Sequence, residues 1–277
     1  MPRITTSLAT VALTCAGAAQ AAPVLEIRGA AARVVVVPQN RSTISVFLVR
    51  ANKRLPLSIS HYGAKVTVTG DIGRKSRGCL INGGGQGARI LGRGAFAYAD
   101  LPQLVILTPM TVKISAGDAV FGTVGRSAAV DLTNSGCGDW TLANVSGPIR
   151  LNQFGSGHAW VGDVGGADLN VADAGKIDLR RVRSGVRAVS SGSGDVRAVL
   201  VNGPLNLRIA GSGDIRVTGG QVSALTVAIA GSGAVLFGGV ARHLDASVAG
   251  PGVVTVAKVT GEVKQHVFGA GAVHVGP

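Results

Sequence analysis

The chain has 277 residues, of which 42 are glycine, 46% are hydrophobic, 15% are charged and only 4% are aromatic, and its net charge is +13 at pH 7. The high apolar fraction and the low charged fraction exclude an intrinsically disordered chain. So few aromatic rings favour a narrow core of small aliphatic side chains, and the length allows either one elongated domain or two compact ones.

Residues 1–21 have the pattern of a signal peptide. Arg3 and the free amine supply positive charge, an apolar stretch runs from Leu8 to Ala19, and Ala19-Gln-Ala21 fits a cleavage site. The apolar stretch, at about a dozen residues, is too short to span a bilayer as a helix. We therefore predict an exported protein, in the periplasm or at the cell surface, that is cleaved near Ala21. Cys15 leaves open whether the chain is lipidated.

Residues 22–110 are expected to form an irregular, strand-rich lead or cap. Short β-branched runs predict strands at 34–37, 44–49, 57–60, 65–69, 104–107 and 112–115, the last just beyond this region. The glycine-rich stretch from Gly78 to Gly87 is expected to be a flexible connection. A cap is needed because an open edge strand is a template for pairing with another chain.

Two cysteines lie outside the leader, Cys79 and Cys137. In an oxidising compartment they could form a disulfide. Alternatively both are free thiols, and Cys137 only fills a turn position that is serine in other copies of the repeat described next. The sequence leaves both alternatives open. We expect no metal site here, because C-x-x-C spacing and a nearby histidine pair are missing.

From residue 111 to 277 a short glycine turn recurs about every 19 residues. Its first glycine is residue 136, 155, 192, 211, 231, 250 or 269, and Asp173-Ala-Gly-Lys176 is a degenerate copy in the longest interval. Such a fixed period indicates stacked repeats, in which each unit buries its face against its neighbours. The expected structural turn residues are Gly136, Gly138, Asp139, Gly155, Gly157, Gly192, Gly194, Asp195, Gly211, Gly213, Asp214, Gly231, Gly233, Gly250, Gly252, Gly269 and Gly271.

Between the turns, apolar and polar residues alternate along two short runs per repeat. The fourth residue after the first glycine is Val196, Ile215, Val235 or Val254, and polar residues such as Arg197 follow. Alternation with period two predicts strands, whereas a helical repeat would need a period of 3.6. We therefore predict an all-β fold, a β-helix or β-solenoid with coils of about 19 residues and two short strands per coil, in which these apolar residues form one internal column.

The repeated Gly-Ser-Gly-Asp-Val/Ile, at 192–196 and 211–215, follows an export signal and a strand-rich lead. This arrangement resembles the putative auto-transporter adhesin, head GIN domain, a bacterial family of unknown function. The resemblance covers roughly residues 30–277 and is strongest from 111 onward. It implies a β-helical fold and an exported location, and it brings no catalytic residues. The chain departs from the motif where Ala234, Val253 and Ala272 replace the turn aspartate.

No reaction is predicted from the sequence. The motifs of serine hydrolases, phosphate-binding loops and zinc proteases are absent. Asp139, Asp195 and Asp214 fit acceptors for turn amides better than calcium ligands, because one carboxylate per coil is half the density of a calcium-binding β-roll. We expect no metal and no cofactor.

A carbohydrate-active β-helix enzyme is the alternative. It would need carboxylates clustered on one face. The distinguishing feature is a cleft that joins any of Asp131, Asp163, Asp168 and Asp178 to an arginine. Trp140 and Trp160, which are 20 residues apart, are either a sugar-stacking pair on one face or two large side chains packed in the protein.

Basic residues are concentrated between 176 and 216, where Arg197 and Arg216 occupy the same outward position of successive repeats. Like charges on neighbouring strands are mildly destabilising, so the pattern indicates either an anionic partner or a solvated face. The candidate anion-contact residues are Lys176, Arg180, Arg181, Arg183, Arg187, Arg197, Arg208 and Arg216.

We accordingly predict a non-enzymatic binding or structural module of the cell envelope. Its candidate partners are an anionic glycan, lipopolysaccharide or membrane headgroups, and we do not expect nucleic acid because stacking aromatics are few. A further alternative is a surface or adhesion protein that self-associates end to end through its terminal coil.

Overall fold

A computed structural model describes residues 23–80 and 86–277 of the chain. The predicted signal peptide, its cleavage site and Cys15 lie outside the described residues. Within them every long element is a strand, and the helical segments are the short 3-10 turns η1 (Gly73–Lys75) and η2 (Tyr98–Asp100). None of the described residues forms a helix that is long and apolar enough to cross a membrane.

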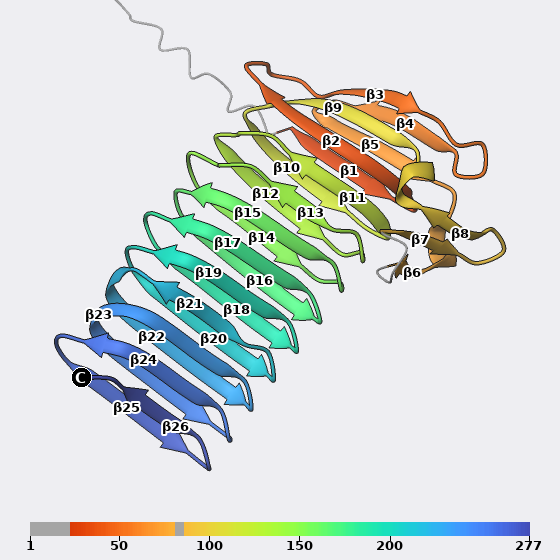
Figure 1. The fold of residues 1–277 in the computed structure, drawn as a ribbon. Helices are drawn as coiled ribbons and strands as arrows, with labels where there is room; N and C mark the ends of the chain where they lie inside the picture. The colour runs from red at the N-terminus through yellow and green to blue at the C-terminus, as the bar shows by residue number, and fades with distance from the viewer. Residues whose placement is uncertain (1–22, 81–85) are drawn as a thin grey trace, which may run out of the picture.

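The strands form two parallel walls, which the chain joins by corners, so that coils about 19 residues apart stack along one axis (Figure 1). The first wall contains, in spatial order, β5 (Lys65–Gly70), β1 (Val24–Arg28), β10 (Thr111–Ala116), β12 (Ala129–Asn134), β14 (Ile149–Gln153), β16 (Ala167–Asp173), β18 (Val186–Gly192), β20 (Leu205–Gly211), β22 (Gln221–Gly231), the second half of β23 (Ala234–Ala249) and β25 (Val263–Phe268).

The second wall contains, in spatial order, β9 (Gln103–Pro109), β2 (Ala31–Gln39), β11 (Ala119–Val124), β13 (Trp140–Leu142), β15 (His158–Val164), β17 (Lys176–Val182), β19 (Asp195–Val201), β21 (Ile215–Gly219), the first half of β23, β24 (Val253–Val259) and β26 (Ala272–Val275).

The internal column that the sequence predicts is present. Val196 pairs with Ile215, Ile215 with Val235, and Val235 with Val254. All four side chains are at most 2% exposed. Inward residues of both walls therefore share one continuous aliphatic core, and the predicted β-solenoid is confirmed.

At the turn that begins with Gly211, the stacking of the coils requires a glycine. Gly211 has φ 138°, in the region that residues other than glycine rarely adopt. A Cβ atom at Gly211 would collide with the carbonyl oxygen of Gly192 in the preceding coil. The degenerate copy occupies an equivalent turn, where Asp173 takes the left-handed conformation at φ 57°.

The turn aspartates join one coil to the next. Asp139 accepts a hydrogen bond from the backbone N–H of His158 at 2.8 Å, and Asp214 accepts one from that of Ala234 at 3.0 Å. Asp195 accepts a longer one, 3.2 Å, from the N–H of Asp214. The carboxylates thus accept hydrogen bonds from backbone amides at the corners, which confirms the role predicted for them.

The parallel stack begins earlier in the chain than residue 111. Strands β1 and β2 form a regular coil, which lies between β5 and β9 on one side and β10 and β11 on the other. The early strands thus belong to the stack although they precede the glycine repeat in sequence. The division of the chain at residue 110 stays a prediction.

Antiparallel strands lie at the N-terminal end of the stack. Strand β3 (Ser45–Arg50) pairs with β9, and β4 (Leu57–Tyr62) pairs with β5. At the opposite end every residue of β25 is exposed, including Val263 and Val267, which continue internal columns of β23. End-to-end assembly through this coil stays a prediction.

A small antiparallel sheet packs beside the first glycine turns. Its strands are β6 (Ser76–Leu80), β7 (Gly87–Ile90) and β8 (Gly94–Ala97), so part of the stretch expected to be a flexible connection is strand. The sheet shares a second apolar cluster with β11, in which Tyr98 meets Phe121 edge to face at 5.5 Å. Cys79 and Cys137 form a disulfide with a Cα–Cα distance of 5.5 Å, and this bond ties the sheet to the stack.

Candidate functional site

The two walls divide the eight candidate anion-contact residues. Strands β17, β19 and β21 of the second wall carry Lys176, Arg180, Arg181, Arg197 and Arg216, whereas β18 and β20 of the first wall carry Arg187 and Arg208. Arg183 lies at the corner that follows β17. Arg197 pairs in register with Arg216, as the repeat spacing predicts. The eight residues therefore do not form one continuous face.

On the first wall, charges of opposite sign alternate along the stack. Lys113 lies 3.7 Å from Asp131, and Asp168 lies between Arg150 at 3.4 Å and Arg187 at 3.9 Å. These residues occupy one column of paired positions on successive strands. Arg187 is therefore one member of a cross-strand ion-pair ladder, an arrangement that stabilises neighbouring strands.

A shallow groove of about 340 Å³ runs over this ladder and brings Asp131 and Asp168 together with Arg150. This is the juxtaposition that the carbohydrate-active alternative requires. Each carboxylate, however, already pairs with a cation of a neighbouring strand. The ion-pair ladder is therefore a sufficient structural reason for these residues to lie together.

On the second wall, Arg180 and Arg181 lie near the end of β17 beside Asp163, and Arg183 follows at the corner; we call these three residues the arginine corner. Asp163 receives a hydrogen bond of 2.7 Å from Nε of Arg180, whose side chain is 65% exposed while that of Asp163 is 12% exposed. The backbone N–H of Asp163 is itself held by the Asn144 side chain at 2.9 Å. Asp163 thus holds the Nε edge of the Arg180 guanidinium, while most of the Arg180 side chain stays exposed to solvent.

The electrostatics of the arginine corner follow from this geometry. The hydrogen bond from Arg180 lowers the pKa of the Asp163 carboxyl below its usual value, and the charges of Arg180, Arg181 and Arg183 lower it further. Three positively charged side chains and one carboxylate thus influence one another, and the net charge of the arginine corner is positive. Guanidinium groups in such a cluster can bind a carboxylate, sulfate or phosphate group through paired N–H donors. Neither Arg181 nor Arg183 has an ion-pair partner within the described part of the chain.

An aromatic site lies next to the arginine corner on the same wall. The His158 and Trp160 rings of β15 stack at 3.9 Å, and Nε2 of His158 lies 2.6 Å from Oδ2 of Asp178 on β17. The indole of Trp160 is 39% exposed. Trp160 pairs in register with Asp178, and Arg180 is two residues further along the same strand. Diagonal neighbours of this kind on a sheet are about 7–8 Å apart and within reach of long side chains.

The hypothesis of two tryptophans stacked on one face is wrong. Trp140 pairs with Ala159, not with Trp160, and it is fully buried. The coil is 19 residues long at this point, so a spacing of 20 moves the second tryptophan by one residue and turns it to the opposite face of the sheet. Only Trp160 is available to a ligand.

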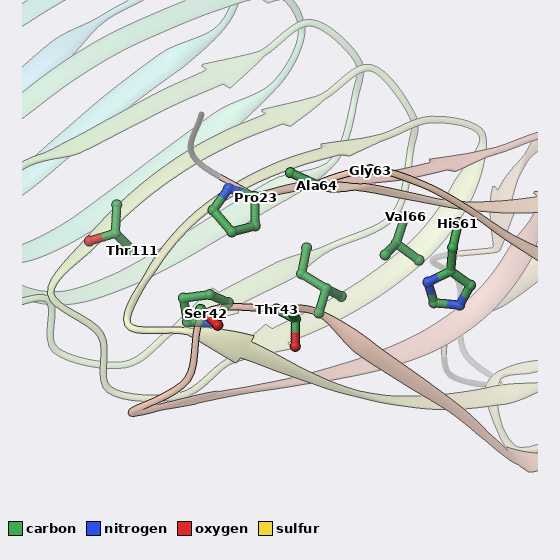
Figure 2. Close-up of a pocket in the computed structure, with 10 residues that line it drawn as sticks. Pro23, Ser42, Thr43, His61, Gly63, Ala64, Val66 and Thr111 are labelled. Carbon is green, nitrogen blue, oxygen red and sulfur yellow. The ribbon is translucent and has the colours of Figure 1, made fainter. Parts of the chain in front are cut away.

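A cleft with a volume of about 630 Å³ lies at the N-terminal end of the stack. Figure 2 shows Pro23, Ser42, Thr43, His61 and Val66 around it. The cleft forms where the chain passes from β9 to β10 beside the inserted coil of β1 and β2. Sequence patterns gave no signal for it, because its lining comes from separate segments that meet only in the fold.

Residues 165–276 match the family model described as putative auto-transporter adhesin, head GIN domain. This confirms the resemblance drawn from the glycine turns over residues 165–276, a shorter stretch than the predicted 30–277. No curated protein and no solved structure matches the chain. The family description suggests an exported or surface protein, and together with the solenoid fold it fits a non-enzymatic surface module.

Proposed function

We propose, from the match of residues 165–276 to the head GIN domain, that the protein is a non-enzymatic module of the cell envelope that binds an anionic glycan at the arginine corner. The observation that carries the proposal is the group of three arginines at the end of β17, in which Arg180 is hydrogen-bonded to Asp163 and Arg181 is the register partner of Asp163. The arginine corner is solvent-exposed and has excess positive charge, and one of its members is pre-oriented by a hydrogen bond.

The position of this site supports an extended ligand. Arg197 and Arg216 continue the positive charge along the stack on the two strands that follow β17. Neighbouring strands of a sheet lie about 4.8 Å apart. A chain molecule with repeated negative charges can therefore contact the arginine corner and then the two arginines in turn, which a single small anion cannot do.

Binding of acidic oligosaccharides tests this proposal. The double variant Arg181→Gln/Arg183→Gln keeps the Arg180–Asp163 hydrogen bond and removes two charges from the arginine corner. We expect its affinity for oligogalacturonate, measured by calorimetry, to fall at least about tenfold, because charge-assisted hydrogen bonds contribute about 1.5–3 kcal/mol each and 1.4 kcal/mol corresponds to a factor of ten.

The matched control is Arg187→Gln/Arg208→Gln, which removes the same charge from the first wall. Its affinity should change less than about twofold, because exposed charges on the far side of the stack are largely screened. Equal losses in the two double variants would show a general charge effect and contradict a site at the arginine corner. Binding to phosphatidylglycerol vesicles but to no acidic saccharide would also contradict the proposal, in favour of lipid headgroups.

A further inference from the structure

We infer that Trp160, with His158, Asp178 and the neighbouring Arg180, forms a subsite for one ring of an acidic saccharide. The inference rests on the proposed function. It adds that one sugar ring of the ligand binds at Trp160 on the second wall. Arg180 is common to both sites, but Trp160 is not part of the arginine corner and stays unchanged in Arg181→Gln/Arg183→Gln, so the two proposals can fail separately.

The geometry of Trp160 distinguishes it from an ordinary surface side chain. Its indole stacks against the His158 ring at 3.9 Å, with 29° between the planes. His158 is in turn held by the Asp178 carboxylate at 2.6 Å and through its backbone N–H by Asp139. The indole thus lies beside an imidazole ring that Asp178 holds at Nε2 and whose backbone Asp139 anchors, while 39% of Trp160 stays exposed. A platform that is oriented before binding loses little conformational entropy when a ligand stacks on it.

The chemistry around the indole fits a sugar that carries a carboxylate. An aromatic face offers apolar contact area to the C–H face of a sugar ring. Asp178, in the register position next to Trp160, offers oxygen atoms that accept hydrogen bonds from sugar hydroxyls. Arg180, two residues further along β17, offers a planar pair of donors suited to a carboxylate. A lipid phosphate would use the arginine and leave the indole without a partner.

The two tryptophans of the chain allow a direct test, because Trp140 is fully buried and Trp160 is not. Titration with trigalacturonate should change the intrinsic tryptophan emission in a saturable manner, while maltotriose of the same length should not. Trp160→Ala should abolish the change and weaken calorimetric binding about tenfold or more, as loss of one stacking platform does. Trp160→Phe should retain most of the affinity, since it keeps a ring.

The matched control is Leu236→Ala, which removes an exposed apolar side chain from the same column of the second wall. Its affinity should equal that of the parent protein. If Trp160→Ala binds trigalacturonate as well as the parent while Arg181→Gln/Arg183→Gln does not, the subsite is refuted and the arginine corner stands. Equal binding of maltotriose, or an emission change caused by phosphatidylglycerol vesicles alone, would refute an acidic saccharide at this position.

Discussion

Replacement of Cys79 and Cys137 by serine is expected to lower the free energy of unfolding of the region around β6, β7 and β8 by about 4 kcal/mol. The two cysteines are 58 residues apart in the chain, and a cross-link across a loop of that length removes conformational entropy from the unfolded state, which raises its free energy by about this amount. The small sheet has only three strands, and its apolar cluster is separate from the main core. It therefore depends on the disulfide more than the coils do.

Hydrogen exchange of the two parts of the molecule measures this effect. Amides of β7 should exchange much faster in the double variant, while amides of β19 and β20, far along the stack, should be unchanged. Dithiothreitol should have the same effect on the parent protein and none on the variant. Equal protection of β7 in the oxidised parent, the reduced parent and the variant would contradict a structural role for the bond.

Replacement of Gly211 by alanine is expected to destabilise the stack by about 3 kcal/mol. Alanine at this position would have to adopt a φ of 138°, and its Cβ atom would collide with the carbonyl oxygen of Gly192 in the preceding coil. The turn must therefore shift, and the hydrogen bonds that Ser212 and Gly213 donate to the Gly192 carbonyl shift with it. The loss should appear as a lower midpoint of urea unfolding.

Gly219→Ala is the control for this effect. Gly219 ends β21, has no heavy atom within 4 Å of the added Cβ atom, and does not have a left-handed φ. Its substitution should change the midpoint little. Equal midpoints for Gly211→Ala and the parent protein would mean that the coils do not contact one another at this turn.

The repeat could be predicted from the sequence because its determinants are local. Alternation of apolar and polar residues specifies which side chains point inward, and the constant spacing of turns specifies which of them stack. Val196 and Ile215 are therefore neighbours in the core, and Arg197 and Arg216 are neighbours on the surface. Each of these relations needs only the positions of the residues relative to the nearest glycine turn.

The position of a residue relative to the glycine turn also indicates which of the two walls it lies on. Arg187 and Arg208 precede a glycine turn and lie on the first wall, whereas Arg197 and Arg216 follow one and lie on the second. When the basic residues are grouped only by their closeness in sequence, residues from two surfaces that face in opposite directions are counted as one face.

The rest depends on contacts that spacing does not encode. Asp163 orients Arg180 from the preceding strand of the second wall, and no repeated motif marks this pair of side chains. Strands β1 and β2 lie in the middle of the early coils although they come first in the chain. This order of strands results from pairing between residues far apart in the chain. The region before residue 111 has no repeated motif from which that pairing could be predicted.

Disulfide trapping tests most directly the claim that the stack places these basic residues on two separate walls. In the variant Arg197→Cys/Arg216→Cys the new thiols lie on adjacent parallel strands in register, at a separation suited to a disulfide. In Arg197→Cys/Arg208→Cys they lie on opposite walls. Oxidation of dilute protein, followed by peptide mass spectrometry, should give an intramolecular 197–216 bond and no 197–208 bond. A 197–208 bond within one chain, or free thiols in the first variant, would contradict the two-wall arrangement and with it the proposed binding face.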